Sequence, residues 1–76
     1  MKIFNEEIVS EYAYNKCLKK DKERYWNLIV DSFWAYMYCR YVKDREEMWK
    51  KIVDSYWACW YCENIKDRPE VRKYIK

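Results

Sequence analysis

The sequence contains no glycine and no histidine, and it has a single proline, Pro69, among its 76 residues. Without glycine a chain has little access to positive φ angles, so the tight turns of β-hairpins are difficult to build. Without histidine it lacks the side chain best suited to acid–base work near neutral pH, and no glycine-rich phosphate loop is present. These absences favour helices over strands and argue against an enzyme.

Long apolar runs are missing as well. No stretch of 18 apolar residues occurs, so the sequence predicts no membrane-spanning helix. The segment 1–7 has no long apolar core and carries two glutamates, unlike a secretory signal peptide. We therefore expect a cytoplasmic protein whose cysteines stay reduced. These cysteines are Cys17, Cys39, Cys59 and Cys62.

Aromatic residues, in contrast, are abundant. Hydrophobic residues make up 51% of the chain, which includes 5 Trp and 9 Tyr. Large rings let a short chain bury much apolar area, which suits one small domain. Charged residues make up 38% with both signs mixed and a net charge of +3, so the charge neither demands nor excludes an acidic partner.

A tandem repeat organises the sequence. The segment 30–35, Val-Asp-Ser-Phe-Trp-Ala, returns 23 residues later at 53–58 as Val-Asp-Ser-Tyr-Trp-Ala. A shorter match 22 residues earlier aligns Ser10 with Ser32. Each such unit lacks a partner for one apolar face until its neighbour stacks on it, so the repeat predicts a solenoid. The predicted units of this single domain are about 1–20, 21–43 and 44–66, with a partial closing helix over 67–76.

Each unit is predicted to contain two short helices, A and B. Helix A is expected to begin at an aspartate, because Asp44-x-x-Glu47 and Asp67-x-x-Glu70 have the form of capping boxes. Apolar residues then recur at helical spacing, so helix A is expected to end near 31–32 and, in the next unit, near 54–55.

Helix B is expected over 33–42 and again over 56–65, with Ser32 and Ser55 as N-caps. At the N-terminal side the tail of a first helix A is expected over 5–10, with Asn5 as its N-cap. At the C-terminal side a further helix A is expected to begin at Asp67. The sequence thus predicts an all-α fold, a short α-solenoid of about seven short helices.

Small residues recur on one face of helix B. They are Ala13, Ala35 and Ala58, followed by Cys17, Cys39 and Cys62. Small side chains let helices approach closely, so these rows are expected to mark the seam between successive B helices. Equivalent positions of stacked helices lie roughly 10 Å apart, too far for a disulfide. The pair Cys59-x-x-Cys62 would need further ligands to hold zinc, and the chain has no histidine, so we expect no metal and no cofactor.

The segments 34–46 and 57–68 are similar to a repeat pattern found in uncharacterised proteins of phages, large viruses and protists. That pattern, Trp-Ala-x-x-Tyr-Ala-x-x-Val-Ile-Lys-x-Arg-x-Glu, belongs to helix-pair repeats of about 22 residues. Here cysteine replaces the second alanine, and aspartate replaces the glycine that usually precedes arginine. The resemblance covers most of the chain and implies an α-solenoid but no particular activity.

A single short array rich in Tyr and Trp also resembles the small accessory proteins of phages, some of which inhibit host defence systems such as CRISPR. That likeness rests on size and repeat type. It implies an inhibitor that acts in the cytoplasm of a host.

Helix B carries more aromatic residues than a narrow buried face can hold, so those off this face are expected to point outward or to pack against helix A. Tyr, Trp, Met and Arg are enriched at protein interfaces. Basic residues in the loops are expected to form a ridge beside them. The predicted partner-binding residues are Tyr14, Tyr36, Met37, Arg40, Tyr41, Lys43, Arg45, Trp60, Lys66 and Arg68.

The function predicted from these features is non-catalytic binding of a macromolecule, in the first place a protein. A nucleic-acid-binding repeat is the second reading, in which the basic ridge follows phosphates and aromatics stack on bases, with affinity falling steeply with salt. The third is a self-associating structural protein whose incomplete end units stack on one another.

Overall fold

The structure is a computed structural model that describes residues 6–76. Within this range the chain forms helices and no strand, which confirms the predicted all-α fold. The helices are α1 (Glu6–Lys19), α2 (Glu23–Trp26), α3 (Ser32–Tyr41), α4 (Glu46–Trp49), α5 (Ser55–Asn64) and α6 (Pro69–Arg72).

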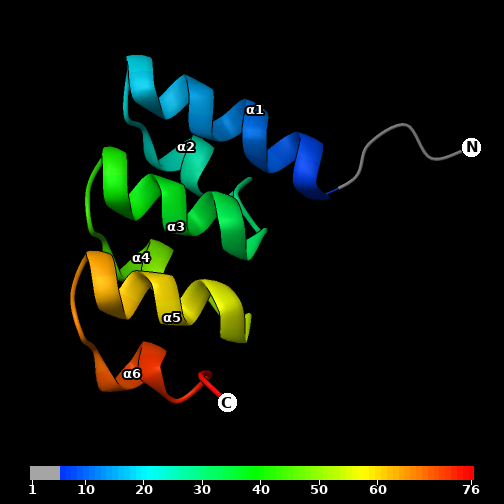
Figure 1. The fold of residues 1–76 in the computed structure, drawn as a ribbon. Coiled ribbons are helices and arrows are strands. Elements are labelled where there is room, and N and C mark those ends of the chain that lie inside the picture. Colours follow the sequence, from blue (N-terminus) through cyan, green and yellow to red (C-terminus); the bar gives the residue numbers. More distant parts are fainter. Residues whose placement is uncertain (1–5) are drawn as a thin grey trace, which may run out of the picture.

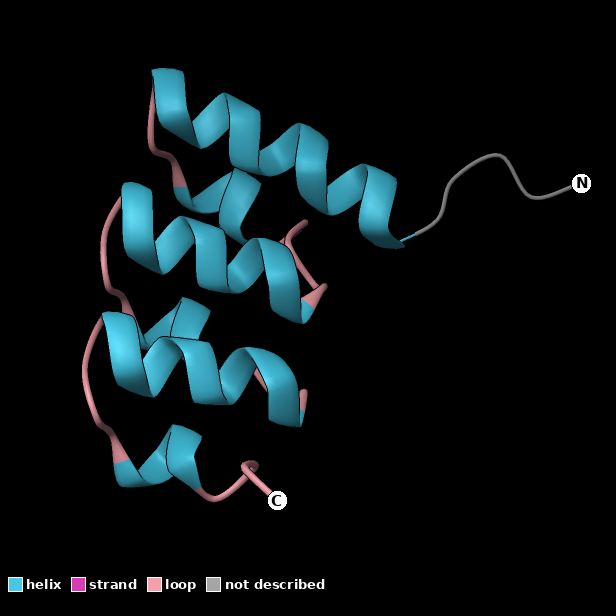
Figure 2. Ribbon diagram, in the orientation of Figure 1, coloured by secondary structure: helices cyan, strands magenta, loops and turns pink. Residues whose placement is uncertain are grey.

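Three long helices, α1, α3 and α5, lie side by side, and the short helices α2, α4 and α6 alternate with them down the stack (Figure 1). Contacts join α1 to α3 and α3 to α5, and each short helix packs on the long helix that precedes it. The loops from long to short helices follow one another along one side (Figure 2). With extents of 35 × 30 × 15 Å, residues 6–76 form a thin array of helix pairs, in which no helix is both long and apolar enough to cross a bilayer.

Aspartates begin the helices α3 and α5. Asp31 and Asp54 are the N-caps, and their carboxylates accept hydrogen bonds from the backbone N–H groups of Trp34 (3.3 Å) and Trp57 (3.4 Å). Each cap satisfies one of the N–H groups that a helix leaves unpaired in its first turn. The helices therefore begin one residue earlier than predicted.

The serines that follow these caps link successive units. Ser32 and Ser55 are the first residues of their helices, so their predicted role as N-caps is wrong. The Ser32 hydroxyl accepts hydrogen bonds from the backbone N–H groups of residues 53–54, at 3.2 and 3.3 Å. The Ser10 hydroxyl accepts the equivalent bonds from residues 30–31, at 2.9 and 3.2 Å. A row of serines thus ties each long helix to the start of the next.

Replacing Ser10 with alanine should lower the free energy of unfolding by about 2 kcal/mol. Ser10 is fully buried, so the substitution leaves two backbone N–H groups without their acceptor. Ser55→Ala is the matched control. The Ser55 hydroxyl accepts a hydrogen bond from the backbone N–H of Lys76 at an exposed site, so its loss should lower the free energy of unfolding by less than about 1 kcal/mol. Urea denaturation followed by circular dichroism measures both variants, and equal costs would contradict this role for Ser10.

The short helices begin after a basic residue and not after the aspartate. They start at Glu23, Glu46 and Pro69, and their N-cap residues form no side-chain capping bond. The capping boxes predicted at Asp44 and Asp67 are therefore wrong. Each short helix has only four residues, whereas helix A was expected to reach the next helix B. The expected length is wrong because a turn, at 27–28 and at 50–51, ends the helix well before the N-cap aspartate of the next long helix.

Helix α1 is continuous from Glu6 to Lys19, so the break predicted at Ser10 is wrong. The alignment of the repeats explains the difference. Val9 stands where the next unit has the N-cap Asp31, and valine has no side-chain oxygen with which to begin a new helix. The N-cap predicted for the first helix, Asn5, lies outside the described residues.

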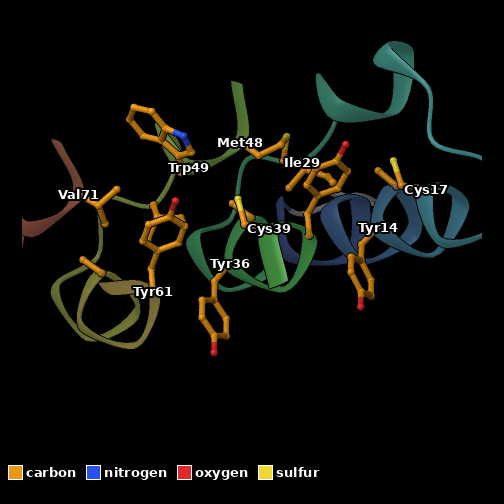
Figure 3. Close-up of a cluster of buried hydrophobic side chains, with 14 residues drawn as sticks. Tyr14, Cys17, Ile29, Tyr36, Cys39, Met48, Trp49, Tyr61 and Val71 are labelled. Atoms are coloured by element: carbon orange, nitrogen blue, oxygen red, sulfur yellow. The ribbon is translucent and has the colours of Figure 1, made fainter. Parts of the chain in front are cut away.

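The core is built from equivalent positions of successive units. Ala13, Ala35 and Ala58 have no exposed surface, as expected for small residues at a helix seam. Aromatic and aliphatic side chains from the helices and from the segments that follow α2 and α4 fill the rest of the cluster (Figure 3). They include Tyr14, Ile29, Tyr36, Tyr38, Met48, Trp49, Ile52, Tyr61 and Val71.

All four cysteines are free thiols. Cys17 and Cys39 are buried, and this burial is the main cause that raises their thiol pKa to about 11 and about 12. The thiol of Cys62, the equivalent residue of the next unit, lies 4.0 Å from the carbonyl oxygen of Arg68. At neutral pH Cys17 and Cys39 are therefore protonated packing residues and not nucleophiles.

Candidate interaction surface

A network of four side chains joins the predicted units 21–43 and 44–66. The Asp21 carboxylate accepts hydrogen bonds from the indole N–H of Trp26 (2.6 Å) and the hydroxyl of Tyr38 (2.7 Å). Arg45 donates through Nε to the Tyr38 hydroxyl (2.6 Å) and through Nη2 to the other oxygen of Asp21 (2.8 Å). Its guanidinium lies 4.0 Å from the centroid of the Trp26 ring. The network therefore fixes α2, α3 and the start of α4 relative to one another.

The Asp–Tyr–Arg hydrogen bonds and the arginine–tryptophan contact recur 23 residues later. Tyr61 donates to Asp44 at 2.6 Å, and Arg68 donates to the Tyr61 hydroxyl at 2.6 Å and to Asp44 at 2.8 Å. The guanidinium of Arg68 lies 4.8 Å from the centroid of the Trp49 ring. Two junctions of the array thus use one set of residue types at one spacing.

Burial and hydrogen bonding shift the pKa values of Asp21 and Tyr38 in the first network. Burial opposes ionisation of Asp21, but hydrogen bonds from Arg45, Trp26 and Tyr38 outweigh it and lower the pKa of this carboxyl below its ordinary value. Burial, with the adjacent carboxylate, raises the pKa of Tyr38. Asp21 therefore stays ionised and Tyr38 stays protonated around neutral pH, which keeps each group in the hydrogen-bonding role that it has here.

Two of the predicted partner-binding residues are held in these networks. Arg45 and Arg68 pair with aspartates of the preceding unit, and their side chains are each only 23% exposed. Their charge is neutralised within the chain, so the predicted basic ridge lacks its two arginines. Lys43 and Lys66 lie in the same loops and are exposed.

The third aspartate of the series is paired differently. Arg72 stands five residues after Asp67, where the earlier units have Trp26 and Trp49. It donates through Nε to Asp67 at 2.9 Å and forms an ion pair with the same carboxylate. The α6 end of the stack thus carries a polar, charge-paired group in place of the Asp–Tyr–Arg–Trp network.

A series of ring contacts crosses the long helices, and we call these residues the aromatic ladder. They are Tyr14, Phe33, Trp34, Tyr36, Tyr56, Trp57 and Trp60. Two equivalent pairs bridge neighbouring helices, Tyr14 with Trp34 at 5.2 Å between centroids and Tyr36 with Trp57 at 5.5 Å. Phe33 lies 4.7 Å from both Trp34 and Trp57. The ladder therefore forms a packed aromatic strip from α1 to α5.

The buried part of the ladder corrects the sequence prediction. Tyr14 and Tyr36, predicted to bind a partner, are only 6% and 3% exposed, because the tryptophan of the next helix covers each ring. Their expected outward orientation is wrong. Met37 is half-buried and packs against the core. Tyr14, Tyr36 and Met37 are therefore packing residues beneath the exposed surface of the long helices.

The other predicted aromatics are exposed. Tyr41 is 56% and Trp60 40% exposed, and Arg40 is exposed next to Tyr41, with its guanidinium 5.4 Å from that ring. Arg40 also donates a hydrogen bond to the Tyr36 hydroxyl at 2.7 Å, which anchors it. Arg40 and Tyr41 lie in the last turn of α3, while Trp60 lies in the middle of α5.

Sequence reasoning missed Tyr56, the most exposed large hydrophobic residue of the ladder at 60%. Its ring lies 4.8 Å from Trp57 and 6.3 Å from Trp60. Its place four residues before Trp60 on one helix was the available signal, because residues four apart on a helix are surface neighbours. Tyr56 and Trp60 thus form an exposed aromatic pair on α5.

Cys59 and Cys62 line a shallow hollow near the α6 end, together with Glu63, Asp67 and Arg72. Burial and the neighbouring Glu63 carboxylate raise the pKa of the Cys59 thiol. The Cys59 thiol therefore stays protonated at neutral pH. Among residues 6–76 no group of three or more cysteine, aspartate or glutamate side chains is arranged to hold a metal ion.

No family model matches this chain, and comparisons with curated proteins and with solved structures found no match either.

Proposed function

We propose that this protein is a non-catalytic protein-binding module. Its partner would contact the exposed part of the aromatic ladder, Tyr56 and Trp60 of α5, together with Arg40 and Tyr41 in the last turn of α3. The observation that carries the proposal is the exposure of large rings on a packed aromatic support. Tyr, Trp and Arg dominate the binding energy of protein interfaces, and rigid rings lose little conformational entropy on binding.

Protein binding is favoured over nucleic-acid binding by the fate of the loop arginines. Arg45 and Arg68 are neutralised by aspartates, so a phosphate backbone would meet mainly Lys20, Lys43 and Lys66 beside acidic residues. Affinity for nucleic acid depends on the number of phosphates that cations neutralise. A discontinuous row of lysines is a weak site by this criterion.

The resemblance to small phage accessory proteins suggests the kind of partner. A 76-residue array without catalytic machinery would inhibit a host protein complex by covering one of its working surfaces. This proposal places the protein in the host cytoplasm.

A photo-crosslinking amino acid at position 60 tests the proposal in the cells where the protein acts. We expect crosslinks to one protein that survive nuclease treatment. Position 50 is the matched control, because Lys50 is exposed but is the C-cap residue of the short helix α4 and is not part of the aromatic ladder. Crosslinks to nucleic acid, or equal yields from both positions, would overturn the proposal.

Trp60→Ala should then weaken binding of the crosslinked protein at least tenfold, because central tryptophans are frequent hot spots. Isothermal titration with the purified partner measures the change. Lys50→Ala should leave the affinity within about twofold of the original. An unchanged affinity for Trp60→Ala would remove the ladder from the interface.

A further inference from the structure

The outer face of α1 has an apolar hollow. It is lined by Ile8, Val9 and Tyr12 of α1 and by Leu28, which follows α2. Ile8, Tyr12 and Leu28 are 54%, 53% and 40% exposed. Contiguous apolar surface of this kind on a small protein marks an interaction site.

The repeat identifies the type of surface that this is. Trp34 of α3 and Lys51 after α4 are the equivalents of Tyr12 of α1 and Leu28 after α2. Both contact the preceding helix pair, which α1 and α2 form with the turn after α2. Trp34 packs on Tyr14, and Lys51 donates to the carbonyl oxygens of residues 26 and 29, each at 2.6 Å. The hollow is therefore the face with which one helix pair covers the pair before it. Among residues 6–76 no unit precedes α1, and Leu28 replaces the lysine with an apolar group.

The opposite end of the array is finished in a different way. Its hollow is lined by Glu63 and the Asp67–Arg72 ion pair, beside Cys59, Cys62 and Ile75. Charged groups on the outer face are typical of a capping repeat, and Glu63, Asp67 and Arg72 place such groups at the α6 end. A second copy that stacked its α1 face there would cover charged groups with apolar side chains, which costs free energy. Continuous end-to-end stacking is therefore disfavoured.

We propose that the α1 face binds the α1 face of a second copy, related by a two-fold axis. Helix α1 carries Glu6 and Glu7 in its first turn and Lys16 and Lys19 in its last. A two-fold axis perpendicular to the helix makes the pair antiparallel, so the acidic turn of each copy lies beside the basic turn of the other. The two helix dipoles also oppose each other.

Tyr12 lies near the middle of α1, so it faces its own counterpart across the axis. Lys16 lies over the Tyr12 ring at 5.5 Å from the centroid, and its stem can extend the apolar contact. Leu28 packs at the edge against the partner's α1. Such a contact is isologous and closes at two copies. It uses a surface separate from the exposed rings of α5, so it does not rest on the proposed function.

Sedimentation velocity over a concentration series tests the proposal. We expect the mass to rise from 9.7 kDa to twice this value and then to stay constant. Tyr12→Glu, at an exposed position, should raise the dissociation constant at least tenfold, whereas Tyr56→Glu on α5 should leave it unchanged. Leu28→Lys should act like Tyr12→Glu and is suited to the fold, because the equivalent residue is Lys51.

Circular dichroism confirms that each variant is folded before its mass is compared. A protein that stays monomeric at every concentration would overturn the proposal. A mass that grows beyond two copies would also overturn it and would instead indicate end-to-end stacking. Equal weakening by Tyr56→Glu would place the contact on the aromatic ladder.

Discussion

Tyr38→Ala should lower the free energy of unfolding by about 4 kcal/mol, because truncation of a buried aromatic side chain removes its packing and leaves a cavity. Tyr38 is fully buried, and its hydroxyl joins Asp21 and Arg45 in the first network. A domain of 76 residues has a total stability of about 4–11 kcal/mol, so this one change should unfold much of the population. Urea denaturation monitored by circular dichroism measures the loss.

Tyr38→Phe separates the ring from the hydroxyl. It keeps the packing and removes two hydrogen bonds, while Asp21 and Arg45 remain paired, so we expect a cost of about 1 kcal/mol. Tyr61→Ala should match Tyr38→Ala, because Tyr61 is equally buried and similarly bonded. Tyr41→Ala, at an exposed site, should change stability by less than about 0.5 kcal/mol. Equal losses for Tyr38→Phe and Tyr38→Ala would show that the hydroxyl, and not the ring, dominates.

The rows of buried residues were predictable because the repeat spacing alone determines them. When equivalent units stack, equivalent side chains meet, and small residues such as Ala35 and Ala58 must lie where helices approach. Both helices that contain these alanines are found within one residue of their predicted limits. Hydrophobic periodicity is a strong signal for long helices, and here the same pattern occurs in two aligned units.

The role of the aspartates was not predictable from local pattern. Asp44 followed by Glu47 has the form of a capping box, yet its carboxylate binds Tyr61 and Arg68, which lie 17 and 24 residues away. Long-range partners with charge-assisted bonds outcompete a local cap. A usable signal did exist, because Asp, Trp, Tyr and Arg recur together at a constant offset of 23 residues from Asp21 to Asp44.

The interaction surface was predicted only in part, since an isolated helix has no neighbours. Helical spacing turns Tyr36 away from the buried face, but Trp57 of the next helix covers its ring. The exposure of Tyr41 and Trp60 agrees with the sequence prediction, because no ring of a following unit covers them among the described residues. The pattern of a single helix predicts which way a side chain points, but the neighbouring helices determine whether that side chain is exposed.

Asp21→Asn should lower the free energy of unfolding by about 2 kcal/mol at pH 7, because it removes the charge that holds Arg45 while leaving the guanidinium partly buried. The folded-state pKa of Asp21 lies below its ordinary value of 3.8, so the folded protein binds fewer protons than the unfolded chain in this range. The contribution of Asp21 is thus complete above about pH 5 and is lost as the pH falls through the folded-state pKa.

Urea denaturation at pH 7 and at pH 2.5 tests this dependence. The difference in stability between the original protein and Asp21→Asn should be largest at pH 7 and should shrink at pH 2.5, where protonation removes the same charge. Asp67→Asn is the matched control, because its ion pair with Arg72 is more than half exposed and should contribute less than about 1 kcal/mol. A difference for Asp21→Asn that stays the same at both pH values would mean that packing at this position, and not the charge of the carboxylate, holds the two units together.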